Sequence, residues 1–256
     1  MLDAKNKQYH INVSSEDIGK YCILPGDPAR VEKIAAHLEA PYRVSVNREY
    51  TIWNGKLEGE TVTVCSTGIG GPSTAIAVEE LAACGATHMI RVGTCGGIST
   101  QVEAGDLVIA TGAVRQDGTS HEYAPSEFPA VSGATSLFSL MSAAKTLGFK
   151  HHTGVVQSKD SFYGQHSPQR MPTQTALLQK WEAWKRLGVL ASEMEASTLF
   201  TVGASLGLEC GAVFLCVWNQ ERYLLGLDGD GTEVHDTEAA IATAIEAIRK
   251  MITEQK

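Results

Sequence analysis

Several features that would assign this sequence to a specialised class are missing from it. No two of its six cysteines show the paired spacing of a zinc site, and most lie in apolar runs that predict buried thiols. No basic cluster interrupts a chain of net charge −8, which argues against nucleic acid as a partner. Residues 1–21 are polar and the longest apolar runs are short, so neither a signal peptide nor membrane insertion is expected. These absences favour a cytoplasmic protein with reduced thiols.

The sequence is also free of internal repeats and of glycine- or serine-rich linkers, and its hydrophobic content of 43% can supply one large core. Short apolar strands alternate with longer amphipathic helices, which predicts one α/β domain over residues 1–256. We expect three α/β/α layers around a central mixed, mainly parallel sheet. Predicted strands span residues 21–24, 61–66, 88–92, 107–114, 153–157 and 212–218. Predicted helices span residues 28–38, 73–84, 136–147, 173–187, 195–206 and 237–252, several followed by a glycine suited to a left-handed cap: Gly85, Gly148, Gly188 and Gly207.

The most informative segment is residues 62–76, in which an apolar strand enters a glycine loop and then a helix. Such a loop can present backbone amides to an anion, although many similar turns only allow close packing. Residues 24–30 repeat the design, with Asp27 as N-cap, Pro28 in the first helical position and Arg30 in the first turn. A second arginine, Arg91, lies in an apolar strand, where a charge needs a partner.

Together with the Glu193-Met194-Glu195-Ala196 run, these pieces resemble the nucleoside phosphorylase family, and most closely the uridine phosphorylases. The resemblance covers nearly the whole chain and includes residues 25–30, 47–50, 65–80 and 91–94 in the expected order. It implies the nucleoside phosphorylase fold and reversible phosphorolysis of uridine and deoxyuridine to uracil and the sugar 1-phosphate, a reaction of pyrimidine salvage. Phosphate would be a co-substrate, with no required cofactor. Three alternatives stay open: a purine nucleoside phosphorylase, a nucleosidase of the same fold, and a non-catalytic nucleoside-binding module.

For phosphate, the resemblance assigns Gly26, Arg30, Arg91 and Thr94 of one subunit and Arg48 of its neighbour. A backbone amide, guanidinium groups and a hydroxyl are suitable donors to such an anion. A surface ion pair is the commoner role of an isolated arginine, but it suits Arg91 poorly because its strand is apolar.

For the ribose, the resemblance assigns Glu195 to the 2′- and 3′-hydroxyls, Met194 to the face of the sugar, and His10 of a neighbouring subunit to the 5′-hydroxyl. A carboxylate can accept two donors from a vicinal diol. Helix initiation is the alternative for Glu193 and Glu195. The catalytic set is therefore expected to be Arg30, Arg91, Thr94 and Glu195, in dimers that share active sites and assemble into hexamers.

For the base, the resemblance implies stacking on Phe162, pairing with Gln165 and contacts from Cys95 and Gly96. The sequence departs from the family pattern at Ser167 and Gln220, where base-facing arginines are usual. The candidate donors to a uracil carbonyl are Lys159, Gln165, His166, Arg170 and Arg222, of which Lys159 and Gln165 are favoured. Asn219 stands where purine-specific relatives have an aspartate, and an amide cannot protonate a purine nitrogen, so a pyrimidine is the simpler substrate.

Two further features follow from the pattern. Glu49, Ile69 and Ser73 match positions that coordinate potassium between subunits in some uridine phosphorylases, with Glu49 as an arginine's structural partner being the alternative. Residues 221–236 form an acidic, glycine-rich stretch after an apolar strand and do not keep the spacing of a calcium loop. A mobile lid and a plain solvated connection are equally compatible with this stretch.

Overall fold

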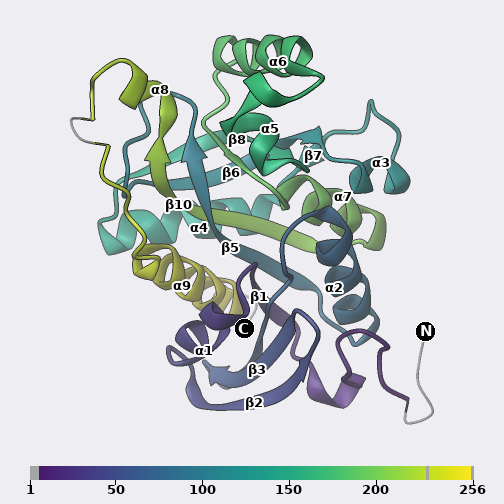
Figure 1. Cartoon of the computed structure of the whole chain (residues 1–256). Coiled ribbons are helices and arrows are strands. Elements are labelled where there is room, and N and C mark those ends of the chain that lie inside the picture. Colours follow the sequence, from purple (N-terminus) through teal and green to yellow (C-terminus); the bar gives the residue numbers. More distant parts are fainter. Residues whose placement is uncertain (1–5, 229–230, 255–256) are drawn as a thin grey trace.

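The computed structural model describes residues 6–228 and 231–254, and these form a large sheet with helices on both faces (Figure 1). The strands are β1 (Tyr21–Pro25), β2 (Glu39–Asn47), β3 (Tyr50–Leu57), β4 (Glu60–Cys65), β5 (His88–Gly97), β6 (Leu107–Gln116), β7 (Ala130–Val131), β8 (His151–Lys159), β9 (Ala191–Glu193) and β10 (Glu209–Asn219). The helices are α1 (Pro28–Ala35), α2 (Gly71–Ala83), α3 (Thr119–Tyr123), α4 (Ala134–Leu147), α5 (Phe162–His166), α6 (Gln174–Arg186), α7 (Ala196–Leu206), α8 (Gln220–Leu224) and α9 (Glu238–Glu254), with 3-10 turns at Ser15–Asp17 and Pro168–Arg170. The predicted α/β class with a mixed sheet is confirmed.

The sheet follows the order β10-β6-β8-β9-β5-β1-β4-β3-β2, and β10 also pairs with β5. Because β5 is bonded to both β9 and β10, the strands β5, β10, β6, β8 and β9 close into a ring, from which β1, β4, β3 and β2 extend. Strands β1, β4, β5 and β10 are parallel neighbours, so their carboxyl ends meet at one edge. Ligands of such sheets bind outside these ends.

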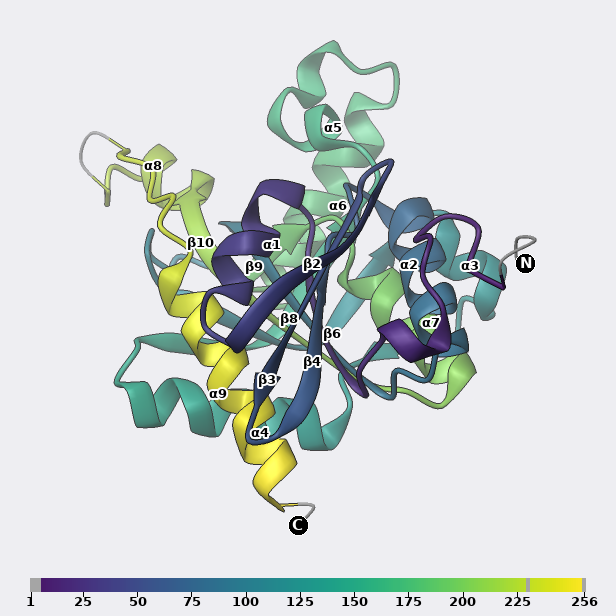
Figure 2. The same ribbon diagram turned by 90° about the horizontal axis from the view of Figure 1, so that it is seen from below.

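Two apolar clusters cover the two faces of the sheet. One lies beneath α2 and α7 and the other beneath α1, α4 and α9 (Figures 1 and 2). β1 contributes Cys22 and Leu24 to the first cluster and Tyr21 and Ile23 to the second, as the two-residue period of a strand requires. All five residues of β1 are therefore buried, which explains its continuous apolar run.

The predicted helices and strands are all present, with shifted ends. The largest extension is in β5, which was predicted to end at residue 92 and continues to Gly97. Asp27 caps α1 by accepting from the Ala29 amide at 2.9 Å, and Gly148 and Gly207 end α4 and α7 in left-handed conformations. Gly85 and Gly188 also have positive φ. The cap predictions are confirmed.

The hairpin of β2 and β3 was not predicted. β2 is largely exposed, so it lacks the apolar pattern by which a strand is recognised. Its two-residue tip is formed by Arg48 and Glu49, between the paired residues Asn47 and Tyr50. Figure 2 shows the hairpin crossing the front of the molecule in that view.

The predicted acidic loop at residues 221–236 begins with a helix, since α8 occupies Gln220–Leu224. Arg222 pairs with Asp228 at 2.5 Å, and residues 229 and 230 lie outside the described residues. Among the helices of the described ranges, none is both long and apolar enough to cross a bilayer.

Candidate active site

Three of the predicted phosphate residues, Gly26, Arg30 and Arg91, meet where β1 ends beside the middle of β5. Gly26 follows β1, and a Cβ there would lie 3.2 Å from the Gly68 carbonyl oxygen, closer than most side chains tolerate. Arg30 lies in the first turn of α1, with Nη1 3.5 Å from the Val92 carbonyl oxygen. Burial lowers the pKa of Arg30, Asp27 opposes this shift, and the positive charge of Arg91 reinforces it. The two guanidinium groups are thus held close enough to repel each other.

Arg91 is buried in β5 and is held by two carboxylates. Its Nε donates to Glu193 Oε2 at 3.0 Å and its Nη2 donates to Glu195 Oε2. Burial alone would lower the pKa of Arg91, but Glu195 and Glu193 outweigh it and raise that pKa. Its Nη1 has no hydrogen-bond partner among the described residues and lies 3.8 Å from the position of a Cβ on Gly26. A buried donor left unpaired is costly, so this nitrogen marks a ligand position.

Glu195 lies between β9 and α7 and is also buried. Its Oε1 accepts from the Gly70 amide at 2.5 Å, while Oε2 accepts from Arg91. Burial raises the pKa of Glu195, Arg91 lowers it and Glu193 raises it, with a net increase. The glycine loop therefore presents one of its amides to a protein carboxylate rather than to a free anion. Each oxygen keeps a lone pair that a ribose hydroxyl could use.

Glu193 initiates a helix, the role that the sequence suggested for both Glu193 and Glu195. It accepts from the backbone amides of Glu195 and Ala196 at 2.9 and 3.0 Å, and so caps α7, while also holding Arg91 and Ser158. The helix-initiation alternative describes Glu193 and not the side chain of Glu195, which makes no capping bond.

Thr94, Cys95 and Gly96 continue β5 beyond Arg91. Thr94 is half-buried, Cys95 is buried opposite Cys216 in the β5–β10 register, and Gly96 pairs with Ser192 of β9. Burial raises the pKa of the Cys95 thiol, and Cys216 adds to that effect.

The predicted base residues come together through Ser192. The Lys159 ammonium donates to Ser192 Oγ at 2.6 Å, and that hydroxyl donates to Gln165 Oε1 at 2.6 Å. Lys159 also lies 6.0 Å from the centre of the Phe162 ring. Burial lowers the pKa of Lys159 to about 8, opposed by Glu193 and Glu195. Ser192 was not singled out by the sequence, because a serine in a three-residue strand carries no pattern.

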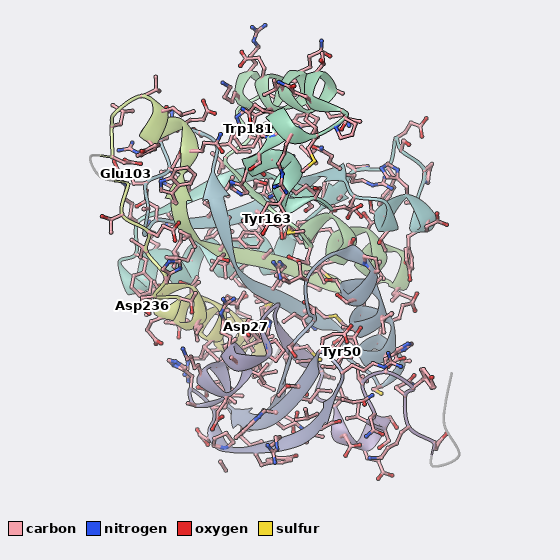
Figure 3. The ribbon with its side chains drawn as sticks, in the orientation of Figure 1. Asp27, Tyr50, Glu103, Tyr163, Trp181 and Asp236 are labelled. Atoms are coloured by element: carbon pink, nitrogen blue, oxygen red, sulfur yellow. The ribbon has the colours of Figure 1, made fainter. Side chains whose placement is uncertain are left out.

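Of the other candidate base donors, Arg222 and Arg170 are engaged elsewhere, and His166 lies beside Phe162. Arg222 bonds to Asp228 and to the Thr100 carbonyl oxygen, and Arg170 stacks on Tyr163 with its Cζ 5.1 Å from the ring centre. The His166 ring lies 4.3 Å from Phe162, and burial lowers its pKa. Figure 3 labels Tyr163 on α5 and Trp181 on α6, which lie together in this part of the molecule.

Asn219 has a structural role that the sequence did not indicate. Its Nδ2 donates to the carbonyl oxygens of Ser99 and Val102, both at 2.8 Å, and its Oδ1 accepts from the amides of Glu221 and Arg222. The side chain caps α8 and has no remaining hydrogen for a base. An amide here keeps α8 in place.

Met194 is half-buried and lines an open cavity together with Ile69, Gly70 and Asp160. His10 and Arg48 do not join this site within one chain. His10 Nδ1 lies 2.7 Å from Glu80 Oε1, in the N-terminal segment, and Arg48 is exposed at the hairpin tip with φ +55°.

The three residues expected at a potassium site are neighbours. Ser73 Oγ donates to the Ile69 carbonyl oxygen at 3.2 Å. A Cβ on Gly68 would lie 3.0 Å from Cγ of Glu49 and 3.3 Å from Oγ of Ser73. A carboxylate, a carbonyl and a hydroxyl thus lie around Gly68, and these are hard oxygen donors suited to an alkali cation.

Comparison with known proteins shows the family of this chain. The sequence profile of the Phosphorylase superfamily matches residues 20–254. A uridine phosphorylase of Treponema pallidum is 53% identical over 247 residues, which cover 96% of this chain and 95% of that protein. A uridine phosphorylase of Klebsiella aerogenes is 40% identical over 255 residues, which cover 97% of this chain and 100% of that protein. A guanosine phosphorylase of Halorubrum lacusprofundi is 40% identical over 207 residues, covering 81% of each. The resemblance inferred from the sequence is thereby confirmed, and the chain belongs to the Phosphorylase superfamily.

Proposed function

We propose that this protein is a pentosyltransferase that catalyses the reversible phosphorolysis of uridine and deoxyuridine to uracil and the sugar 1-phosphate. The observation that carries the proposal is the unpartnered Nη1 of buried Arg91 beside Gly26 and Arg30, next to the carboxylate of Glu195. An anion donor site adjoining a diol acceptor is what a phosphorylase needs. The uridine phosphorylases among the relatives support uridine as the nucleoside.

Phosphate binds, in this proposal, to Arg91, Arg30, Thr94 and the Gly26 amide. Arg91 reaches it with a guanidinium already fixed by Glu193 and Glu195, so little side-chain entropy is lost on binding. A phosphate oxygen then attacks C1′ of the ribose while the bond from C1′ to the base nitrogen breaks. No protein nucleophile is required, because the arginines supply orientation.

Glu195 accepts from the ribose hydroxyls, and Met194 packs against the sugar. The bond's electron pair leaves with uracil, whose carbonyl oxygens take up negative charge. The Lys159 ammonium and the Gln165 amide stabilise that charge, with Phe162, Cys95 and Gly96 around the ring. Uracil then takes a proton from solvent.

The site is completed, we propose, by His10 and Arg48 of a neighbouring subunit, in dimers that assemble into hexamers. Arg48 is exposed at a hairpin tip, from which it can reach another chain. Glu49, the Ile69 carbonyl and Ser73 would hold potassium, whose chemistry there is to neutralise oxygens at the interface. The six buried free thiols support a cytoplasmic location, and residues 1–256 form one domain in this proposal.

The test measures release of the free base and formation of the sugar 1-phosphate by the purified protein from uridine, deoxyuridine, cytidine, inosine and guanosine, with and without phosphate. We expect phosphate-dependent cleavage of uridine. Equal cleavage without phosphate would indicate a nucleosidase, preference for inosine or guanosine a purine enzyme, and nucleoside binding without product a binding module.

A pair of variants makes this test specific to the anion site. Arg91→Lys keeps the charge and loses the forked donor, so uridine cleavage should fall on the order of a hundredfold. Arg249→Lys is the matched control, because Arg249 also pairs with two glutamates, Glu58 and Glu246, on the surface at α9. Equal losses in both variants would contradict the assignment of Arg91.

A further inference from the structure

A buried carboxylate that the proposed reaction does not use belongs to Asp117, in the turn between β6 and α3. Its Oδ1 accepts from the hydroxyls of Ser120, at 2.9 Å, and Ser197. Its Oδ2 accepts from the Ser120 amide at 2.7 Å and from Thr198 Oγ1 at 3.0 Å. Four donors use all the lone pairs that a carboxylate offers, so the position of this group relative to α3 and α7 is fixed.

The Asp117 carboxylate keeps its charge in spite of its burial. The side chain belongs to a residue that is 4% exposed, and removing a charge from water is costly. Burial raises the pKa of Asp117, but the hydrogen bonds from Ser197, Ser120 and Thr198 outweigh it and lower that pKa. A charged acceptor therefore holds these donors at neutral pH, and it holds them more strongly than a neutral one would.

Two of the four donors belong to the helix that follows Glu195. Ser197 and Thr198 are the second and third residues of α7, and the Ser197 amide also donates to Ser158 Oγ at 2.8 Å. The first turn of α7 is thus held by the buried carboxylate, by Ser158 of β8 and by Glu193 of β9. Because Glu195 directly precedes this turn, the turn sets the direction from which its carboxylate enters the site.

One of these hydroxyls also lies against the glycine loop. Helices α2, α3 and α7 are neighbours (Figures 1 and 2), and Gly71 begins α2. A Cβ on Gly71 would lie 2.7 Å from Oγ1 of both Thr119 and Thr198. The preceding residue, Gly70, donates its amide to Glu195 Oε1 at 2.5 Å. The Thr198 hydroxyl, whose hydrogen is directed at the buried carboxylate, therefore sets the spacing between α7 and the loop that binds Glu195.

We propose that Asp117 is a positioning residue, which holds the Glu195 carboxylate where it accepts from both hydroxyls of the ribose diol at once; this inference rests on the proposed function. Oε1 of Glu195 is bound by Gly70 of the glycine loop and Oε2 by Arg91 of β5, while the main chain of Glu195 leads into α7. The three segments must keep their spacing if two oxygens are to match two adjacent hydroxyls. A misplacement of about 1 Å can cost about a hundredfold in rate.

The two sugars of the proposed substrates depend on this spacing to different degrees. A ribose has to satisfy two hydrogen bonds to Glu195 in one geometry. A 2′-deoxyribose offers one hydroxyl, and a small shift of the sugar can restore a single bond after the carboxylate moves. Asp117 therefore contributes to a preference for uridine over deoxyuridine.

The first test measures kcat/KM of Thr198→Val and Asp117→Asn for uridine, 2′-deoxyuridine and 5′-deoxyuridine. Valine removes the hydroxyl at nearly constant volume, and asparagine leaves two of the four donors without an acceptor. We expect uridine and 5′-deoxyuridine, which both keep the diol, to fall about tenfold, the effect of one lost hydrogen bond. 2′-Deoxyuridine should fall less than about threefold, because only one bond depends on the carboxylate. Equal losses for all three substrates, or no loss in the folded variants, would overturn the proposal.

Each variant has a matched control in the chain. Thr201→Val makes the same change one turn further along α7, where Thr201 is 1% exposed and its Oγ1 has no hydrogen-bond partner among the described residues. Asp106→Asn replaces another buried carboxylate, which accepts from the Glu103 amide at 3.0 Å before the start of β6. Asp106→Asn should lower the midpoint of thermal unfolding, and both controls should leave the ratio of the uridine to the 2′-deoxyuridine value unchanged. A ratio altered as much in a control as in its counterpart would refute the assignment.

The second test asks whether the effect passes through Glu195. Calorimetric titration without phosphate gives the dissociation constants of uridine and 2′-deoxyuridine in the absence of turnover. Thr198→Val should reduce the preference for uridine severalfold in the wild-type background. In the Glu195→Gln background it should have no further effect on the preference, because the carboxylate that is positioned is gone. The same reduction in both backgrounds would show that Thr198 acts independently of Glu195 and would refute the positioning role.

The outcomes distinguish this inference from the proposed function. Absence of phosphate-dependent cleavage of any nucleoside by the wild-type protein would refute the function. Cleavage of uridine with a sugar preference that is insensitive to Asp117 and Thr198 would leave the function intact and refute the inference alone.

Discussion

Raising the pH through about 8 should switch off uridine cleavage, because Lys159 loses its proton there. Burial lowers the pKa of Lys159 to about 8, opposed by the carboxylates of Glu193 and Glu195. The ammonium donates to Ser192 Oγ at 2.6 Å and carries the positive charge that stabilises a charged uracil oxygen, whereas the neutral amine carries none. At pH 9 about a tenth of the sites would carry the proton, so kcat/KM should fall about tenfold for each further pH unit.

The assay compares kcat/KM for uridine, at saturating phosphate, in the wild-type enzyme and in Lys159→Arg. The pH runs from about 6.5 to about 9.5, a range centred on the pKa of about 8. Arginine keeps its proton throughout this range, so the alkaline decline should disappear in the variant, whatever its absolute rate. Uridine itself loses its N3 proton in alkaline solution, but equally for both enzymes. The same decline in both would refute the role of Lys159.

The lowered pKa of Lys159 also predicts that the free energy of unfolding depends on pH. The unfolded chain keeps the Lys159 proton up to about 10.5, so between about 8 and 10.5 it binds more protons than the folded chain. The free energy of unfolding therefore rises with pH in this window, by about 3 kcal/mol at most. Lys159→Met should be about 2 kcal/mol more stable than the wild type at pH 7, allowing for the lost Ser192 bond, and the advantage should vanish above pH 10.5. Urea unfolding at equal protein concentration measures this difference, and parallel pH dependences would contradict it.

Three further predictions address the rest of the site. Mixing inactive Arg48→Ala and Arg91→Ala proteins under subunit exchange should restore about a quarter of the sites, because one site of each mixed dimer is intact, and exchange without recovery would refute a shared site. Glu193→Gln should raise KM for phosphate about tenfold, read from phosphate titrations, because it weakens the hold on the Arg91 guanidinium. Gly70→Ala and Gly59→Ala should each lose about 1 kcal/mol in thermal unfolding, since their φ angles are +94° and +85°. Only Gly70→Ala should also raise KM for uridine, and an equal rise in both would disprove the link between the Gly70 amide and ribose binding.

Features set by local chemistry were predictable from the sequence. The Asp27 cap, the left-handed glycines after α4 and α7, and the short apolar strands each follow from neighbouring residues alone. The position of Arg91 in an apolar strand also correctly predicted that this charge has a partner. The exposed strand β2 and the three-residue strand β9 could not be recognised, because neither contains an apolar period.

Contacts between distant segments were not predictable. Arg91 meets Glu193 across 102 residues, and nothing in either segment distinguishes the glutamate that caps α7 from the one that faces the ligand. Asn219 was interpreted through the chemistry of a base, although its four hydrogen bonds secure α8. The positions of Gln116, Gln157 and Trp184 relative to one another depend on the β6–β8 register and on the position of α6. Only the fold determines both.

The attachment of the Arg91 guanidinium at two of its three nitrogens has a consequence for inhibitor design. Two arms of the guanidinium are fixed by Glu193 and Glu195, and the third is left directed at the Gly26 corner. A ligand that reaches this arm meets a rigid donor and need not order it, so small tetrahedral oxyanions should bind with high affinity per atom. Compounds that tether such a group to a uracil-like ring would therefore combine two prearranged subsites, with the linker alone left to be optimised.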